Sequence, residues 1–154
     1  MFLTRFRQLF TSGVFVCLIL LGVIGCAPAK QNSATYDVSN ASIRTPMAGR
    51  TVTAGYFDFK NNSAATVTIV GVSGDVAASI EMHTIKKVDD QMRMRPLPEV
   101  SVAPGAEVNF VSGGNHLMLF DVQLGDSPSI LKIELANGVI VEAPFQHTQL
   151  IDSD

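Results

Sequence analysis

Apolar and polar residues alternate with a period of two along most of the chain beyond residue 50, the pattern of strands with one buried face. Segments rich in Val, Ile, Thr and Phe show this alternation at 51–60, 66–72, 79–88, 106–111, 115–124, 129–135 and 138–145. Short runs of Gly, Asn, Asp, Ser and Pro separate them. No window of ten or more residues carries a convincing helical period, so the sequence predicts an all-β domain.

Two of the turns join neighbouring strands. Asn137-Gly138 predicts a type I′ hairpin, because both residues tolerate positive φ. Asp89-Asp90 is expected to pair segment 91–95 with segment 79–88. About seven to nine short strands in about 120 residues favour an antiparallel, immunoglobulin-like β-sandwich. A small barrel is the alternative.

The first 25 residues have the features of an export signal. Arg5 and Arg7 precede an apolar stretch from Gly13 to Gly25. Thirteen helical residues span about 20 Å, less than the roughly 30 Å hydrocarbon core of a bilayer. The stretch ends Val23-Ile24-Gly25-Cys26, which resembles a bacterial lipobox and implies cleavage before a lipidated Cys26. An uncleaved anchor running from Leu9 is the alternative.

Removing residues 1–25 changes the composition. The chain has 154 residues and a net charge of −3, and the leader takes two arginines with it, so the mature charge is −5. This acidic balance disfavours nucleic acid as a partner. Cys17 is lost with the leader and Cys26 becomes a thioether. The mature chain then has no free thiol, which excludes a disulfide framework and a multi-cysteine zinc site.

We expect Cys26 and residues 27–34 to form a lipidated tether, residues 35–146 a β-sandwich domain and residues 147–154 a short tail. Ala27 after the cysteine resembles enterobacterial signals that favour the outer membrane over the inner one. The expected location is therefore the periplasmic side of the bacterial envelope.

Histidine and methionine are the residues with candidate chemistry. Four of the five mature methionines lie between positions 82 and 118, together with His83 and His116. On a strand, His116 and Met118 share one face about 7 Å apart. Imidazole with thioether is a soft ligand set that selects Cu(I) and works without a thiolate. Against this stands the ordinary use of Met as core filler and of histidine as a satisfied polar group.

The spacing of four of these residues resembles a known family. Ten residues separate His83 from Met94, twenty-one separate Met94 from His116, and Met118 follows two positions later. This is the H-x10-M-x21-H-x-M pattern of the periplasmic copper chaperones called PCuAC, the copper A centre accessory proteins. The segments Ile80-Glu81-Met82-His83, Met92-Arg93-Met94-Arg95-Pro96 and Gly113-Gly114-Asn115-His116-Leu117-Met118-Leu119 resemble the family as well.

The resemblance implies a cupredoxin-like sandwich that binds one Cu(I) through His83, Met94, His116 and Met118. It also implies copper delivery in the periplasm, to cytochrome c oxidase or to a thioredoxin-like copper partner. Two departures are Ile85, where many members have a second Met, and a tail with His147 alone, where many have a His- and Met-rich Cu(II) site. A second copper site is therefore not expected, and His147 is interpreted as a solvated tail residue.

Three further groups of residues are assigned by their position. Met92 shares a face with Met94 and is a candidate auxiliary ligand, whereas Met82 faces away from His83 and is expected in the core. The basic residues are interpreted as a solvated strand edge, with steering of an acidic partner as the alternative; they are Lys86, Lys87, Arg93 and Arg95.

The leading hypothesis is a membrane-tethered Cu(I) carrier that exchanges ligands with its target and catalyses no reaction. Copper buffering or resistance would use the same site, and a metal-free interaction lipoprotein is a further alternative. A blue-copper redox role would need a cysteine thiolate, which the mature domain lacks. No nucleophile setting suggests a hydrolase.

Overall fold

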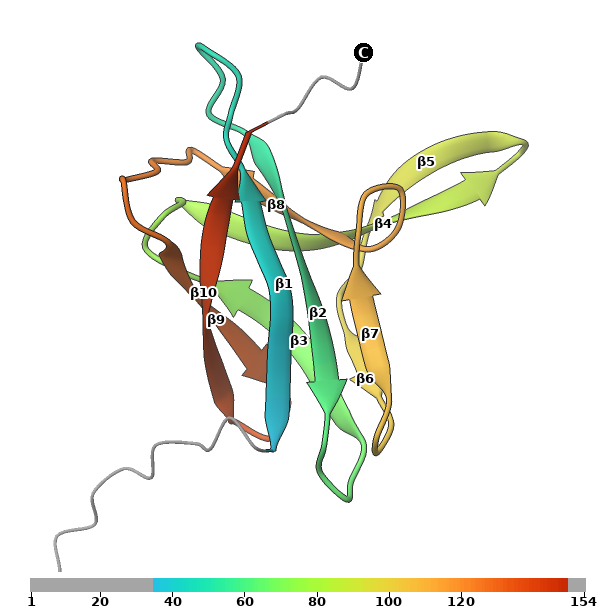
Figure 1. Ribbon diagram of the computed structural model, residues 1–154. Helices are drawn as coiled ribbons and strands as arrows, with labels where there is room; N and C mark the ends of the chain where they lie inside the picture. The colour runs from blue at the N-terminus through green and yellow to red at the C-terminus, as the bar shows by residue number, and fades with distance from the viewer. Residues whose placement is uncertain (1–34, 150–154) are drawn as a thin grey trace, which may run out of the picture.

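The computed structural model describes residues 35–149, and these contain ten strands and no helix (Figure 1). The predicted leader, Cys26, the tether and residues 150–154 lie outside the described residues. The strands are β1 Tyr36–Arg44, β2 Thr53–Asn61, β3 Val67–Ser73, β4 Ser79–Val88, β5 Gln91–Pro96, β6 Val100–Val102, β7 Glu107–Phe110, β8 His116–Phe120, β9 Ser129–Leu135 and β10 Ile140–Thr148.

The strands follow the order β5-β4-β8-β2-β1-β10-β9-β3-β6, and β7 pairs with the second half of β2. Figure 1 shows β9 and β3 behind β10, β1 and β2, so the path folds into two layers. The predicted all-β sandwich is confirmed, with ten strands rather than seven to nine. The expectation of a purely antiparallel arrangement is wrong at one place, because β1 and β10 run parallel.

Aromatic side chains fill the space between the layers. Phe57 of β2 stacks on Phe110 of β7 at 4.4 Å between ring centroids and meets Phe145 of β10 edge-on at 5.7 Å. Leu131 and Ile133 of β9 are fully buried in the same hydrophobic core. Burying about 25 cal/mol per Å² of apolar surface makes this cluster the main stabilising feature of the domain.

Two strands, β1 and β6, are not predicted by the period-two pattern. In β1, Asn40 adopts φ +51° and the pairing with β2 shifts by one residue between Ser39 and Ser42. Such a bulge moves every later side chain to the other face, so the alternation in the sequence is interrupted. β6 has only three residues, too few for a pattern to be recognised.

The structure has turns at the predicted positions, but one of them differs in geometry from the prediction. At Asn137-Gly138 only Gly138 has positive φ, and its amide donates to the Leu135 carbonyl. This is a three-residue loop closed by a glycine bulge instead of the predicted type I′ turn. Asp89 and Asp90, by contrast, both have positive φ, at 50° and 60°. The two-residue turn with left-handed central residues therefore lies between β4 and β5.

The β4–β5 hairpin extends away from the body of the sandwich (Figure 1). β5 lies at the end of the strand order, and all six of its residues are exposed. β4 matches its predicted range, whereas β8 ends at Phe120 rather than near residue 124 because Asp121 turns the chain with φ +53°. These three strands carry all four predicted copper ligands.

Candidate metal centre

The two histidines of the pattern face each other across neighbouring strands. His83 of β4 and His116 of β8 are directly paired in the antiparallel register, and their ring centroids lie 6.1 Å apart. Leu117 and Leu119 of β8 are fully buried in the core. Because side chains alternate along a strand, His83 and His116 point away from the core, on the outer face of this part of the sheet.

Met118 and Met94 lie on the same outer face, on opposite sides of the histidine pair. Met118 is half-buried and pairs with Glu81, the row next to the histidines. Met94 is 44% exposed and pairs with Ile85, the row on the other side. Each row is one two-residue step, about 7 Å, from the histidine row. The fold thus brings residues 83, 94, 116 and 118 to one face, with the histidines in the middle.

His83 is held at one ring nitrogen only. Its Nε2 lies 2.8 Å from Oε2 of Glu81, and its side chain is 13% exposed. Its Nδ1 is buried and has no hydrogen-bond partner among the described residues. A buried polar atom left without a partner costs free energy, and such atoms concentrate at functional sites.

The glycine loop before β8 orients His116. The ring Nδ1 of this buried histidine lies 3.0 Å from the Gly114 carbonyl oxygen. A carbonyl oxygen only accepts, so Nδ1 carries the proton and donates, and Nε2 holds the lone pair of the neutral ring. The Ile85 amide donates to the same carbonyl at 3.3 Å. The loop therefore ties β4 to the His116 ring.

The remaining predicted residues have the following positions. Met92 pairs with Lys87, one row beyond Met94 on the same face, and is 64% exposed. Met82 is 6% exposed and belongs to the core, as predicted. His147 is half-buried within β10, and its Nε2 lies 2.9 Å from Ser129 Oγ. The interpretation of His147 as a solvated tail residue is wrong, because β10 continues to Thr148.

The basic residues lie on the hairpin as expected. Lys86 pairs directly with Arg93, Arg95 pairs with Thr84, and all three cations are exposed. Lys87 forms an ion pair with Asp90 at 2.7 Å. Because β5 is an edge strand, these positions fit the interpretation as a solvated edge.

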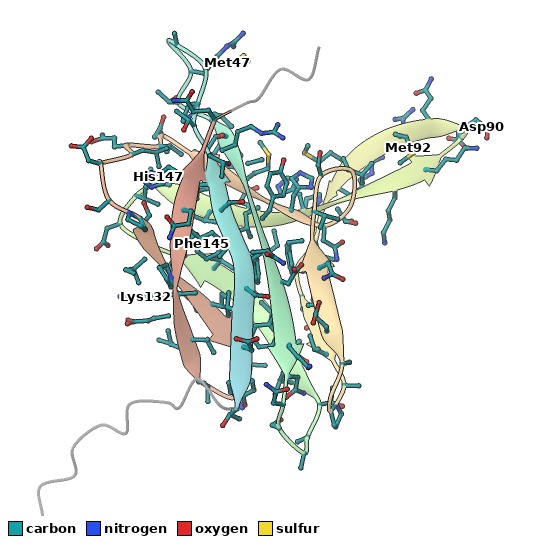
Figure 2. All side chains as sticks on the ribbon, in the orientation of Figure 1. Met47, Asp90, Met92, Lys132, Phe145 and His147 are labelled. Carbon is teal, nitrogen blue, oxygen red and sulfur yellow. The ribbon has the colours of Figure 1, made fainter. Side chains whose placement is uncertain are left out.

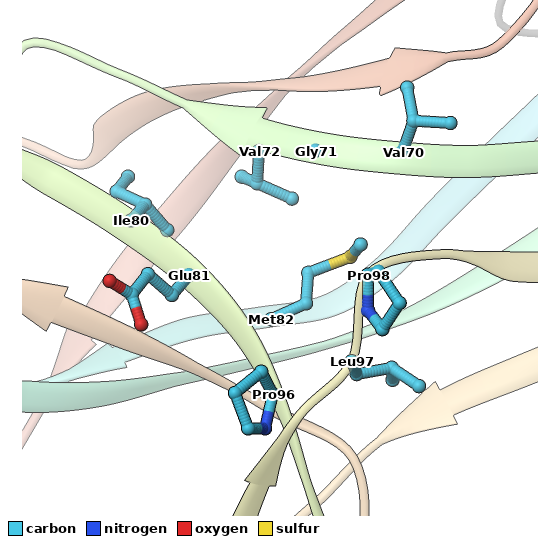
Figure 3. Close-up of a pocket in the computed structure, with 9 residues that line it drawn as sticks. All are labelled: Val70, Gly71, Val72, Ile80, Glu81, Met82, Pro96, Leu97 and Pro98. Atoms are coloured by element: carbon cyan, nitrogen blue, oxygen red, sulfur yellow. The ribbon is translucent and has the colours of Figure 1, made fainter.

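Two pockets lie near these residues. One, of about 250 Å³, opens between β3 and β4, and aliphatic side chains and prolines form most of its wall (Figure 3). Met82 and Glu81 reach it, but neither histidine does. The other, of about 220 Å³, has Met118 in its wall together with Met47, Arg44 and Arg50. Met47 belongs to the loop between β1 and β2 (Figure 2).

Glu81 belongs to this candidate centre, although the sequence pattern predicts no role for it. A signal was available, since a residue two positions before His83 on a strand must share its face. Within residues 35–149 no three residues of the types His, Cys, Asp and Glu gather as a metal site. The same residues include no helix that is long and apolar enough to cross a bilayer.

Comparisons with known proteins agree with this picture. The family model "Putative lipoprotein LpqE-like" matches residues 36–126. The "Putative lipoprotein Lxx21020" of Leifsonia xyli subsp. xyli is 30% identical over 118 residues, which cover 70% of this chain and 69% of that protein.

Solved structures show the same fold. The copper-bound PCuAC domain from PmoF2 aligns with a TM-score of 0.61 at 15% identity, over 75% of this chain and 93% of that one. The Cu(I) form of DR1885 from Deinococcus radiodurans aligns with a TM-score of 0.55 at 18% identity, over 74% and 78%. With its family model covering more than half of its length, the chain belongs to the LpqE-like lipoprotein family and has the fold of PCuAC domains.

Proposed function

We propose that this protein is an exported, membrane-tethered metallochaperone that binds one Cu(I) through His83, His116, Met94 and Met118. The observation that carries the proposal is the cross-strand histidine pair with a methionine row on either side. Two imidazole nitrogens and two thioether sulfurs form a neutral, soft set suited to Cu(I). The long, flexible methionine side chain can cover the step between rows.

The exposure of the ligands supports delivery of the ion by ligand exchange. The histidines are mostly covered, whereas Met94 and Met92 on the edge strand are open to solvent. An incoming ligand could therefore displace the Met94 sulfur first, while both histidines still hold the ion. Met92 lies one row further out and serves as an alternate ligand during this exchange. The chain would carry copper without catalysing a reaction.

The strand register supports an orientation for the tethered protein. Tyr36, the first residue of β1, pairs with Asn61 at one end of β2, and Met118 pairs with Ala54 near the other end. Seven residues of strand separate these points, about 23 Å. A lipid on Cys26 would attach at the end where β1 begins, so the copper ligands would face away from the membrane, toward a respiratory oxidase or its assembly factors.

Anaerobic titration against a Cu(I) chelator tests the site. The wild-type chain should take one Cu(I), and Met94→Ala combined with Met118→Ala should weaken binding by at least tenfold. Ile140→Ala removes an exposed apolar side chain of β10, away from the proposed ligands, and is the control. Affinity should also fall as the pH falls, because protonated imidazole cannot bind metal. Equal affinity of the double variant and the wild type would refute the proposed ligand set.

Delivery and anchoring need tests in the cell. A deletion strain grown at limiting copper should lose cytochrome oxidase activity if the protein delivers copper, and added copper should restore it. A loss of copper tolerance with normal oxidase activity would instead identify a buffering or resistance protein. Cys26→Ser should release the protein from the membrane fraction, and an unchanged membrane location would argue against lipidation.

A further inference from the structure

We infer that Glu81 is a positioning residue for the metal centre, whose carboxylate holds the His83 ring so that Nδ1 presents its lone pair to the ion. This inference rests on the proposed function. A carboxylate oxygen accepts hydrogen bonds, so the 2.8 Å contact requires the proton on Nε2 of His83. The neutral ring has a single N–H, which leaves a lone pair on the buried and unpartnered Nδ1.

The strand geometry places Glu81 next to two of the proposed ligands. It lies two residues before His83, so both side chains project from the same face of β4. The register also sets it directly opposite Met118. Its carboxylate contacts His83, and this is its only ion pair among the described residues.

His116 is also held by a hydrogen bond at one ring nitrogen, but at Nδ1 instead of Nε2. Its Nδ1–H donates to the Gly114 carbonyl, and its Nε2 holds the lone pair. Each histidine is thus fixed through one nitrogen, and within residues 35–149 no hydrogen bond is formed at the other. Metal-binding histidines commonly donate their second N–H to a carboxylate or a backbone carbonyl, which fixes the tautomer and raises ligand basicity. This pair uses one acceptor of each kind.

The contact predicts a graded response to substitution. Glu81→Ala removes the acceptor, and loss of such an outer partner typically weakens metal binding 10- to 100-fold. Glu81→Gln keeps an oxygen that can accept from Nε2–H but removes the negative charge, so its affinity should fall only a few-fold. Glu142→Ala, which removes an exposed carboxylate of β10, is the control and should change nothing.

Nitrogen-15 NMR of the copper-free chain at pH 8 reads the tautomers directly. The wild type and Glu81→Gln should show His83 protonated at Nε2, and Glu81→Ala should show a mixture, while His116 stays protonated at Nδ1. Cu(I) competition on the same proteins then measures the affinities. A tautomer of His83 unchanged in Glu81→Ala would overturn the inference. So would equal weakening by Gln and Ala, which would make the carboxylate a direct ligand.

The two proposals fail in different ways. A wild-type chain that binds no Cu(I) would refute the proposed function, yet the tautomer of His83 would still report whether Glu81 positions the ring. A wild-type chain that binds Cu(I) tightly, with Glu81→Ala equal to it in affinity, would refute the positioning role alone.

Discussion

The hairpins β4–β5 and β9–β10 are both pairs of antiparallel strands, but they differ in how far their side chains are buried. In β9–β10, alternate residues are buried, among them Leu131, Ile133 and Phe145. In β4–β5, the whole of β5 is exposed, and its methionines lie in solvent. One hairpin contributes to the core, and the other extends beyond it with its thioethers accessible. Metal exchange needs accessible ligands, which a packed hairpin cannot supply.

Two methionines of the β4–β5 hairpin differ in exposure in the same way. Met82 and Met94 both belong to the β4–β5 hairpin, but Met82 is buried and Met94 is 44% exposed. Along β4, the core face carries Met82 and Thr84, and the outer face carries Glu81 and His83. Alternation along this one strand thus places core residues on one face and residues of the proposed site on the other.

The largest expected change in stability comes from the packed hairpin β9–β10. Phe145→Ala would leave a cavity beside Phe57, whose ring it meets at 5.7 Å. Truncation of a buried Phe costs about 3–5 kcal/mol of unfolding free energy. Denaturant unfolding of the wild type and the variant measures this loss. A cost below about 1 kcal/mol would show that the two layers are not held together by this cluster.

The next effect separates the two methionines. Met82→Ala should cost about 2 kcal/mol, the low end for a buried Met, because the neighbouring 250 Å³ pocket already limits its packing. Met94→Ala should change stability by less than about 0.5 kcal/mol, as is usual for surface positions. Denaturant unfolding gives both values. Cu(I) affinity should show the reverse order, and a Met82→Ala variant that folds but loses copper would contradict the division.

A third prediction concerns the turn of the packed hairpin. Gly138 has φ +83°, and a side chain added there would meet no neighbouring atom. Gly138→Ala should therefore cost about 1–2 kcal/mol from backbone strain alone. Gly125→Ala is the control, because Gly125 has no positive φ and an added Cβ there also meets no atom, and it should cost less. Thermal unfolding of both variants measures the difference, and equal melting temperatures would contradict the assigned turn.

Much of this architecture could be predicted from the sequence, because most strands bury one face. The ranges 79–88 and 129–135 match β4 and β9, where alternation is unbroken. β1 was missed because the bulge at Asn40 reverses the faces midway. At Asn137-Gly138, residue preference allowed two loop types, and the pairing of the flanking strands decides between them.

The candidate site, too, could be predicted only in part from the sequence. The spacing pattern identified four residues by resemblance, and the alternation placed His116 and Met118 on one face. The pairing of His83 with His116 is a contact between residues far apart in the chain, which no local pattern specifies. The role of Glu81 depends on which nitrogen of His83 it contacts. His147 was misassigned because β10 continues through the polar residues Gln146 and Thr148.

The smallest expected effect lies at the exposed hairpin, where Lys86 and Arg93 are directly opposite each other. Like charges in this position destabilise a strand pair, and opposite charges stabilise it by about 0.2–1 kcal/mol. Lys86→Glu should therefore raise stability slightly, an effect that added salt should reduce. Chemical denaturation at low and high salt measures the change, with Lys132→Glu on β9 as the control, where the new carboxylate would face Glu142 and lower stability. If Lys86→Glu destabilises the domain, the cations do not repel each other across the pair. If it stabilises the domain as expected, the Lys86–Arg93 pair lowers the stability of the wild-type domain. This pair lies on the hairpin that carries Met94.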